Sequence, residues 1–261
     1  MLKPALPGKR FWESRGNMND TRQAKAYAPR ARHWAGAPKQ PRWQAEASGL
    51  QNHPDMNDTR KAEPPLDVSG DRWGWHRRGY LPHVDHPHLC QSVTFRLADA
   101  LPAEVVAKWK VRLADQDNVQ AAAELRRRID GYEDAGHGAC CLRDPVCANL
   151  VAEHLLAGAG QDYRLWAWVV MPNHVHVLIG PIADQRLDLT AITRRWKGRT
   201  ARAIQAHLGR SGRFWQPESF DRWIRDDRHF AAVSLYIENN PVHAGLCARP
   251  EAWRWSSAWE R

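Results

Sequence analysis

Two apolar segments around residue 172 constrain the fold more than any other feature of the sequence. "YRLWAWVVMP" at 163–172 and "HVHVLIGP" at 174–181 each have the composition of a β-strand. The Pro-Asn pair at 172–173 separates them, and this dipeptide favours a turn. The sequence therefore predicts a β-hairpin of two antiparallel strands.

The second strand of this hairpin carries two histidines. His174 and His176 share one face because side chains on a strand alternate, and Val175 and Val177 then face the core. Two imidazoles side by side present two nitrogen ligands to one metal ion. Taken alone, however, such a pair is more often two ordinary exposed or hydrogen-bonded histidines, so the motif needs a second feature.

Periodicity elsewhere in the chain adds helices and further strands to the hairpin. This order of elements predicts an α+β fold, in which helices pack against a mainly antiparallel sheet. The predicted elements are a strand at 90–97, a helix beginning at Pro102, a helix ending near Asp134, a helix capped by Asp144, a helix at 189–208, a strand after it, and a helix from Asp227 to Asn239 that stops at Pro241.

The N-terminal part of the chain shows neither helical nor strand periodicity. It is rich in Pro, Gly, Asn, Gln, Arg and Asp, a composition that disfavours a packed core. We therefore expect a disordered extension at 1–78 and one folded domain at 79–259. The pentapeptide "MNDTR" occurs at 18–22 and again at 56–60, and one hypothesis is that the native protein begins at Met56.

A strong positive charge is the main guide to the partner. The formal net charge is +9 and the sequence pI is near 9.6. This favours a polyanion, and nucleic acid is favoured over a membrane because no basic amphipathic anchor stands out. Fourteen tryptophans, several among arginines, suit base stacking as well as core packing. Without an apolar run of 18 residues or a signal-peptide core, the chain is expected to be cytoplasmic.

The five cysteines do not predict a disulfide framework, because their number is odd and two of them are adjacent. A zinc site is the alternative use of such residues. His137, Cys140, Cys141 and Cys147 lie close together in the sequence, but their spacing lacks a C-x-x-C pair. Buried or incidental thiols are the favoured interpretation.

A second chemical motif lies near the C-terminus, in "SLYIENNPVHAGL" at 234–246. Tyr236 and Asn240 are four residues apart and therefore share one face of a helix. Asn240 stands directly before Pro241, so its amide oxygen could turn towards a site. The plainer interpretation is a tyrosine packed in the core and an asparagine that caps the helix.

Together, the two motifs resemble those of the HUH-type single-tyrosine transposases, and of the REP-associated tyrosine transposases in particular. "VVMPNHVHVLI" is similar to the family's His-hydrophobe-His strand, and "YIENNPVHAG" to the segment that holds its nucleophilic tyrosine. "RRWKGRTARAI" and "FWQPESFDRWIRD" also look like family segments. The resemblance covers about 77–259, and it implies the HUH nuclease fold with its ferredoxin-like palm.

Carried over to this chain, the resemblance implies a metal-dependent DNA transposase. His174, His176 and Asn240 would bind Mg²⁺ or Mn²⁺, for which a mixed nitrogen and oxygen ligand set is suitable. Tyr236 would attack single-stranded, hairpin-forming DNA, leave a 5′-phosphotyrosine and a free 3′-OH, and allow strands to be rejoined. The protein would act in the cytoplasm at the nucleoid, as a monomer or homodimer.

The basic helix at 189–208 and the aromatic segment after it are the predicted DNA-binding region. A charged stripe is usually a solvated face, and the tryptophans here can equally belong to the core. Aromatic residues among arginines nevertheless suit a single strand or a hairpin foot. The predicted DNA-binding residues are Arg194, Arg195, Lys197, Arg199, Arg202, Trp215, Arg222 and Arg225.

Two other functions compete with this interpretation. A histidine-triad nucleotide hydrolase also uses alternating histidines on a strand, but its third histidine would fall at Leu178. The stronger alternative is a protein derived from a transposase that binds DNA hairpins without cutting them. Retention of the tyrosine, both histidines and the asparagine argues against that alternative.

Overall fold

The computed structural model describes most of the chain after residue 74. The described residues are 75–77, 82–84, 88–115, 118–183 and 185–259. All of them lie within one compact unit. A short strand, β1 (Trp75–Arg77), pairs with β2 (Pro82–Val84) and begins inside the segment predicted as an extension. The rest of the predicted disordered segment, with the repeated pentapeptide and Met56, lies outside the described residues.

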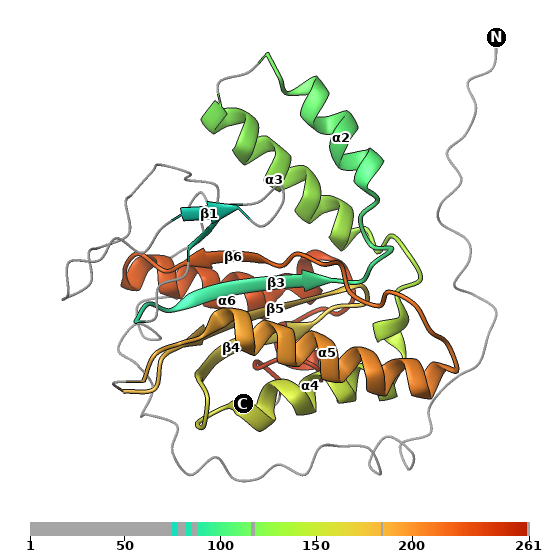
Figure 1. Ribbon diagram of the computed structural model, residues 1–261, viewed down its shortest axis with the longest axis vertical. Coiled ribbons are helices and arrows are strands. Elements are labelled where there is room, and N and C mark those ends of the chain that lie inside the picture. Colours follow the sequence, from blue (N-terminus) through green and yellow to red (C-terminus); the bar gives the residue numbers. More distant parts are fainter. Residues whose placement is uncertain (1–74, 78–81, 85–87, 116–117, 184, 260–261) are drawn as a thin grey trace. The chain divides into compact units, whose positions relative to one another are not determined.

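A four-stranded antiparallel sheet carries the candidate site (Figure 1). In spatial order its strands are β4 (Arg164–Val170), β5 (His174–Gly180), β3 (Gln91–Arg96) and β6 (Phe220–Trp223). The predicted hairpin is β4–β5, and the strand predicted at 90–97 is β3, which lies beside β5. Every neighbouring pair in this sheet is antiparallel.

Helices cover both faces of the sheet, which confirms the predicted α+β class. The helices are α2 (Ala103–Arg112), α3 (Asn118–Asp134), α4 (Pro145–Gly158), α5 (Leu189–Leu208) and α6 (Asp227–His243), with short 3₁₀ turns η3 (Cys141–Arg143) and η4 (Pro250–Ala252). Figure 1 shows α4 and α5 on one side of the sheet and α6 on the other, with α2 and α3 above the β3–β6 side. None of the described helices is long and apolar enough to cross a membrane.

Aspartate caps set the starts of the three helices that pack on the sheet. Asp144, Asp188 and Asp226 each accept a hydrogen bond from a backbone N–H in the first turn of α4, α5 and α6, respectively. Helix α5 ends at Gly209, whose φ of +61° is the left-handed conformation that a side chain would disfavour. Its bounds are those predicted from the sequence.

The prediction that the last helix stops at Pro241 is wrong. Helix α6 continues through Pro241 to His243. Proline removes one N–H donor, but the last turn remains closed because the Ala244 N–H bonds to the Asn240 carbonyl and the Leu246 N–H to the Pro241 carbonyl. Asn240 therefore lies inside the helix and is fully buried, rather than at its free end.

The side of the sheet that faces α4 and α5 is apolar. Val93 and Phe95 of β3 and Val175 and Val177 of β5 form its centre, and all four are fully buried. Leu155 of α4 and Trp196 of α5, with their apolar neighbours, complete the cluster. This packing accounts for the alternation that the sequence shows in both strands.

The opposite side of the sheet combines apolar and polar residues. Leu178 of β5 packs with Val233 and Ile237 of α6. Further along the same side, His174 and His176 are 1% and 2% exposed, and their register partners on β3 are Arg96 and Thr94. The histidine pair thus lies in the interior, between the sheet and α6.

Candidate active site

The structure brings the two sequence motifs together, because β5 and α6 pack face to face. The Nε2 atoms of His174 and His176 are 3.0 Å apart. The Asn240 side chain reaches to 3.3 Å from Nε2 of His176. The ring of Tyr236 lies against the same imidazole, at a centroid distance of 5.6 Å and an interplanar angle of 72°. Residues sixty positions apart in the sequence therefore form one site.

Hydrogen bonds on the far side of each imidazole fix its orientation. Asn173 Oδ1 accepts from His174 Nδ1 at 2.7 Å, while its Nδ2 donates to the carbonyls of Glu133 and His137. These two carbonyls determine which end of the amide faces the ring. Nδ1 of His176 lies 2.8 Å from Thr94 Oγ1. With both Nδ1 atoms engaged, the two Nε2 atoms are directed towards each other.

These donors fit a hard divalent cation. Ligands at right angles around Mg²⁺, at about 2.1 Å each, lie roughly 3.0 Å apart, and the two Nε2 atoms have this separation. Oδ1 of Asn240 is buried and has no hydrogen-bond partner. Rotation of this amide by half a turn would exchange its nitrogen and oxygen and direct the oxygen at the same point.

The electrostatic surroundings keep both imidazoles neutral, as metal ligands must be. Burial lowers the pKa of His174 to about 3, and the positive charges of Arg96 and Arg126 act in the same direction. Burial also places the pKa of His176 well below its usual range, with His174 and the same arginines contributing. At neutral pH neither ring is therefore an imidazolium, and each can offer a nitrogen to a metal ion.

Tyr236 is held as the neutral phenol. Burial raises its pKa well above 10, and the carboxylate of Asp130 adds to this effect, whereas Arg126 opposes it. A nucleophilic phenol in this position has to lose its proton during the reaction. A role of Tyr236 as nucleophile would therefore require a proton acceptor near its hydroxyl group.

Helix α3 adds charged groups to the site that were not predicted from the sequence. Arg126 pairs with Asp130 at 2.9 Å, and its guanidinium lies 3.8 Å above the centre of the Phe220 ring. Phe220 of β6 pairs with Thr94 of β3, the residue that holds His176. The i, i+4 spacing of Arg126, Asp130 and Asp134 places them on one helical face, which is the sequence signal that could have identified them.

Two further α3 carboxyl groups lie away from solvent: Glu133 is buried and Asp134 is half-buried. Glu133 is 1% exposed and pairs with Arg96 at 2.8 Å. Burial raises the pKa of Asp134 to about 7, and the nearby charges of Asp130 and Glu133 add to the effect. A carboxyl group with such a pKa is suited to exchange protons at neutral pH.

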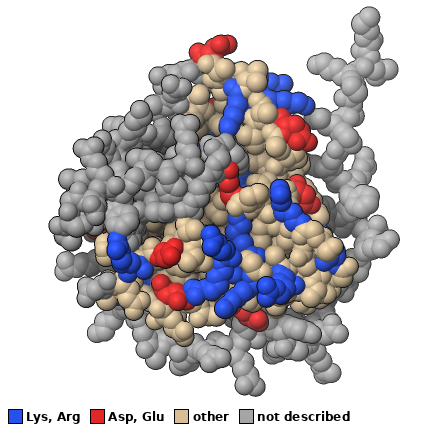
Figure 2. All heavy atoms as spheres, in the orientation of Figure 1, with Lys and Arg blue, Asp and Glu red and all other residues tan. Residues whose placement is uncertain are grey.

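The predicted DNA-binding residues fall into several environments. Arg194, Arg199 and Arg202 are exposed on α5, and Figure 2 shows Lys and Arg side chains gathered along this side of the molecule. Arg195 is bound to Asp162 at 2.6 Å. Trp215 is only 5% exposed and donates to Thr200, so it belongs mainly to the core. Arg222 and Arg225, near β6, are half-buried.

A groove of about 710 Å³ runs between α5 and the segment at 214–221. Arg194 and Lys197 line it, and Trp215 forms part of its wall. Nζ of Lys197 donates to the Pro217 carbonyl at 2.8 Å, which ties the two sides of the groove together. Burial lowers the pKa of Lys197 to about 8, so the ammonium group is still mostly charged at pH 7.

The cysteines are all free thiols, and the zinc group considered from the sequence does not assemble. Cys140 donates to the Gly136 carbonyl, and His137 stacks on Tyr132. Cys140 and Cys147 are buried, as the favoured interpretation held. Cys147 instead lies near Asp144 and His207.

The four residues at the centre of the site lie within a segment that matches a protein-family model. Residues 153–240 match the family model described as "Transposase IS200 like". The region that contains His174, His176, Tyr236 and Asn240 is therefore similar to the IS200-like transposases. This match agrees with the resemblance to transposases that the sequence motifs indicate.

Two solved structures are similar to part of the chain. One is a REP-associated tyrosine transposase bound to a REP hairpin, with 16% identity, a TM-score of 0.42, and coverage of 70% of this chain and 82% of that chain. The other is described as a transposase, from Deinococcus radiodurans, with 19% identity, a TM-score of 0.26, and coverage of 63% and 96%. No curated protein matches the sequence.

Proposed function

We propose that the protein is a metal-dependent endonuclease and strand transferase that acts on single-stranded DNA with hairpin-forming, REP-like ends. One observation supports this above all others. The Nε2 atoms of His174 and His176, the amide of Asn240 and the ring of Tyr236 converge at one buried point. Two nitrogen donors, an oxygen donor and a potential nucleophile are the groups needed for metal-assisted attack on a phosphodiester.

The proposed reaction has two steps that conserve the phosphodiester bond energy. The Tyr236 oxygen attacks phosphorus, a new P–O bond forms, and the bond to the 3′ oxygen breaks. The products are a 5′-phosphotyrosine and a free 3′-OH. A 3′-OH of the same or another strand then attacks the phosphotyrosine, which rejoins DNA and releases Tyr236.

His174, His176 and Asn240 would hold Mg²⁺ or Mn²⁺. The bound ion would polarise the phosphate oxygens and reduce the electrostatic repulsion between the phosphate and an anionic nucleophile. The chain itself must remove the phenol proton. The charges of Asp130 and Asp134 of α3 both raise the pKa of Tyr236. We propose that one of these two carboxylates accepts the phenol proton. Asp134 is the better acceptor because its pKa is near 7.

The groove beside α5 is the proposed DNA-binding surface, where a backbone contacts Arg194 and Lys197. The groove and the histidine pair lie on opposite faces of the sheet. Strand β6 separates them: Asp221 lines the groove, while the neighbouring Phe220 lies under Arg126. A DNA strand that reaches both therefore passes over the β6 edge. Such a protein would work in the cytoplasm, at the nucleoid.

Covalent adduct formation is the direct test. Purified protein is mixed with Mn²⁺ and labelled hairpin DNA taken from inverted repeats beside the gene, and the adduct is resolved on a denaturing gel. We expect a labelled protein band that Tyr236→Phe abolishes. Tyr132→Phe is the matched control, because this phenol also lies in the folded region but packs with Trp109 and His137 on the α2–α3 arm.

The outcomes separate the proposal from its alternative. Hairpin binding without any adduct would identify a DNA-binding protein that no longer cuts. An adduct that persists in Tyr236→Phe would reject the assigned nucleophile. Activity that is unchanged by a chelator would reject the metal site at His174 and His176.

A further inference from the structure

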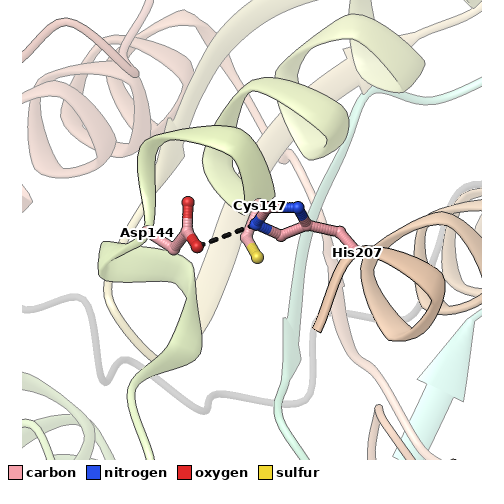
Figure 3. Close-up of side chains that lie close together, drawn as sticks. All are labelled: Asp144, Cys147 and His207. Carbon is pink, nitrogen blue, oxygen red and sulfur yellow. Dashed lines mark hydrogen bonds and ion pairs between the residues drawn. The ribbon is translucent and has the colours of Figure 1, made fainter. Parts of the chain in front are cut away.

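A second group of metal-ligand side chains lies on the side of the sheet opposite the candidate active site. Asp144, Cys147 and His207 bring a carboxylate oxygen, a sulfur and an imidazole nitrogen within 4.8 Å of one another. Figure 3 shows the three side chains together, with Asp144 and Cys147 at the start of α4 and His207 on α5. Within the described ranges, no other group of three or more His, Cys, Asp or Glu donors is this close.

The fold of the two helices explains why these donors meet. Asp144 is the N-cap of α4, and its Oδ1 accepts from the Val146 N–H at 2.8 Å. Its second oxygen remains for Nε2 of His207, at 2.9 Å. Cys147, three residues after the cap, lies in the same first turn. His207 is in the last turn of α5, which packs along α4.

We propose that Asp144, Cys147 and His207 form a binding site for a thiophilic divalent metal ion, with zinc as the expected occupant. A thiolate, an imidazole and a carboxylate are the donors that zinc combines in proteins. A tetrahedral zinc ion separates such ligand atoms by roughly 3.3–3.6 Å. Here Nε2 of His207 and Oδ2 of Asp144 are 2.9 Å apart, and all three donor atoms lie within 4.8 Å of one another, so side-chain rotations can bring them to this range.

The site has an entrance and a place for a fourth ligand. The side chains of Asp144 and His207 are each 35% exposed, whereas Cys147 is fully buried. An ion can thus arrive from solvent and meet the sulfur on the inner side. On binding, the sulfur–metal bond replaces the S–H bond and the proton leaves to solvent. Three protein ligands leave one position for water.

The ion would join the start of α4 to the end of α5. These helices meet in the core through Val151 and Leu155 of α4 and Ile204 of α5. A metal bridge at the rim of that contact stabilises the folded state, because the unfolded chain does not hold the three donors together. The simpler reading is a helix cap with an ion pair and a buried thiol, and it predicts no metal binding.

Cobalt(II) is the probe that separates the two readings, because a thiolate ligand gives a sulfur-to-cobalt charge-transfer band in the near ultraviolet. Metal-free full-length protein is titrated with Co²⁺ and then with Zn²⁺. We expect the band to saturate at one equivalent, to disappear when Zn²⁺ displaces cobalt, and to be accompanied by a higher melting temperature. A folded protein without the band, judged by circular dichroism, would overturn the proposal.

Variants assign the band to this site rather than to the candidate active site. Cys147→Ser should remove it and weaken zinc binding by more than about 100-fold. His207→Gln, at a partly exposed position, gives the same test if the buried Cys147 variant does not fold. His176→Ala and Cys247→Ser should retain the band. A band that survives both Cys147→Ser and His207→Gln would reject the site, whatever the outcome of the DNA-cleavage assay.

Discussion

The two faces of the sheet are made by alternate residues of the same strands, yet they differ in what they bury. Towards α4 and α5 the strands present Val93, Phe95 and Val177, and burial of these apolar side chains stabilises the fold. Towards α6 they present His174 and His176, which are buried almost as deeply. Buried polar groups destabilise a fold unless each has a partner. Here Asn173 Oδ1 accepts a hydrogen bond from His174, and the Thr94 hydroxyl bonds to His176.

Alternate residues of the same strands therefore have different roles: one face contributes to stability and the other holds the candidate site. The apolar face can be filled by any well-packed hydrophobic residues, whereas the polar face specifies which nitrogen of each ring is free. The buried Asn240 Oδ1 has no partner in the structure. A buried oxygen without a partner destabilises the fold, and the proposed metal ion would supply that partner. Substitutions on the two faces should therefore have different consequences.

The largest expected effect is on catalysis, from the polar face. His176→Ala removes a proposed ligand and should lower adduct formation by more than about 1,000-fold, because the metal-dependent step is lost as a unit. Its effect on unfolding is a separate one: the truncation leaves a cavity and the buried Thr94 hydroxyl without its partner, which should lower the free energy of unfolding by about 1–3 kcal/mol. Single-turnover cleavage with Mn²⁺ and urea unfolding are measured on the same preparation. Cleavage within tenfold of the wild type would contradict the assignment.

Ile179→Ala, on the same strand but on the apolar face, should lower stability without this loss of catalysis. Ile179 is fully buried in the cluster beneath α4 and α5. Its truncation leaves a cavity and should lower the free energy of unfolding by about 2–5 kcal/mol, and Ile179→Val by about 0.5–1.5 kcal/mol. Adduct formation at a temperature where the variant is folded should be nearly unchanged. Equal losses of cleavage in Ile179→Ala and His176→Ala would show that the two faces are not independent.

The sequence predicts the apolar face better than the polar one, for a physical reason. Alternation in β3 and β5 and the aspartate caps are local signals, so these elements and the bounds of α5 follow from short stretches of chain. The pairing of Tyr236 with His176 required two motifs to be considered together. The contribution of α3 was missed, because its contacts with Arg96 and Phe220 join segments that no local pattern relates.

Intermediate effects are expected from the residues that orient the imidazoles. Thr94→Val replaces the hydroxyl that holds His176 with a methyl group of similar size, and it should weaken Mn²⁺ binding by about 10–100-fold. The observable is the Mn²⁺ concentration at half-maximal cleavage, with cleavage recovering at saturating Mn²⁺. Thr94→Ser keeps the hydroxyl and should behave as the wild type. A loss that saturating metal does not restore would indicate a general packing defect instead.

The pH dependence of stability should come in part from His229 on α6, the helix that covers the polar face. Burial lowers the pKa of His229, in the first turn of α6, to about 4. Between about pH 6.5 and 4 the unfolded chain binds a proton at this site that the folded chain does not, so folding loses stability as the pH falls. The raised pKa of Asp134 acts in the opposite sense. His229→Gln should therefore gain stability relative to the wild type on acidification, and equal urea midpoint shifts from pH 7.5 to 5 would contradict this.

The smallest effects should come from single charges on α5, and two adjacent arginines sharpen the comparison. Arg194 is exposed and lines the groove, whereas the charge of Arg195 is already paired with Asp162. If DNA lies in the groove, Arg194→Gln should weaken hairpin binding a few-fold and reduce the slope of log K against log salt by about 0.7, the loss of one single-strand phosphate contact. Arg195→Gln should change the slope less. Equal slopes in the two variants would place the DNA backbone elsewhere, because the groove makes only one of these neighbours available to a phosphate.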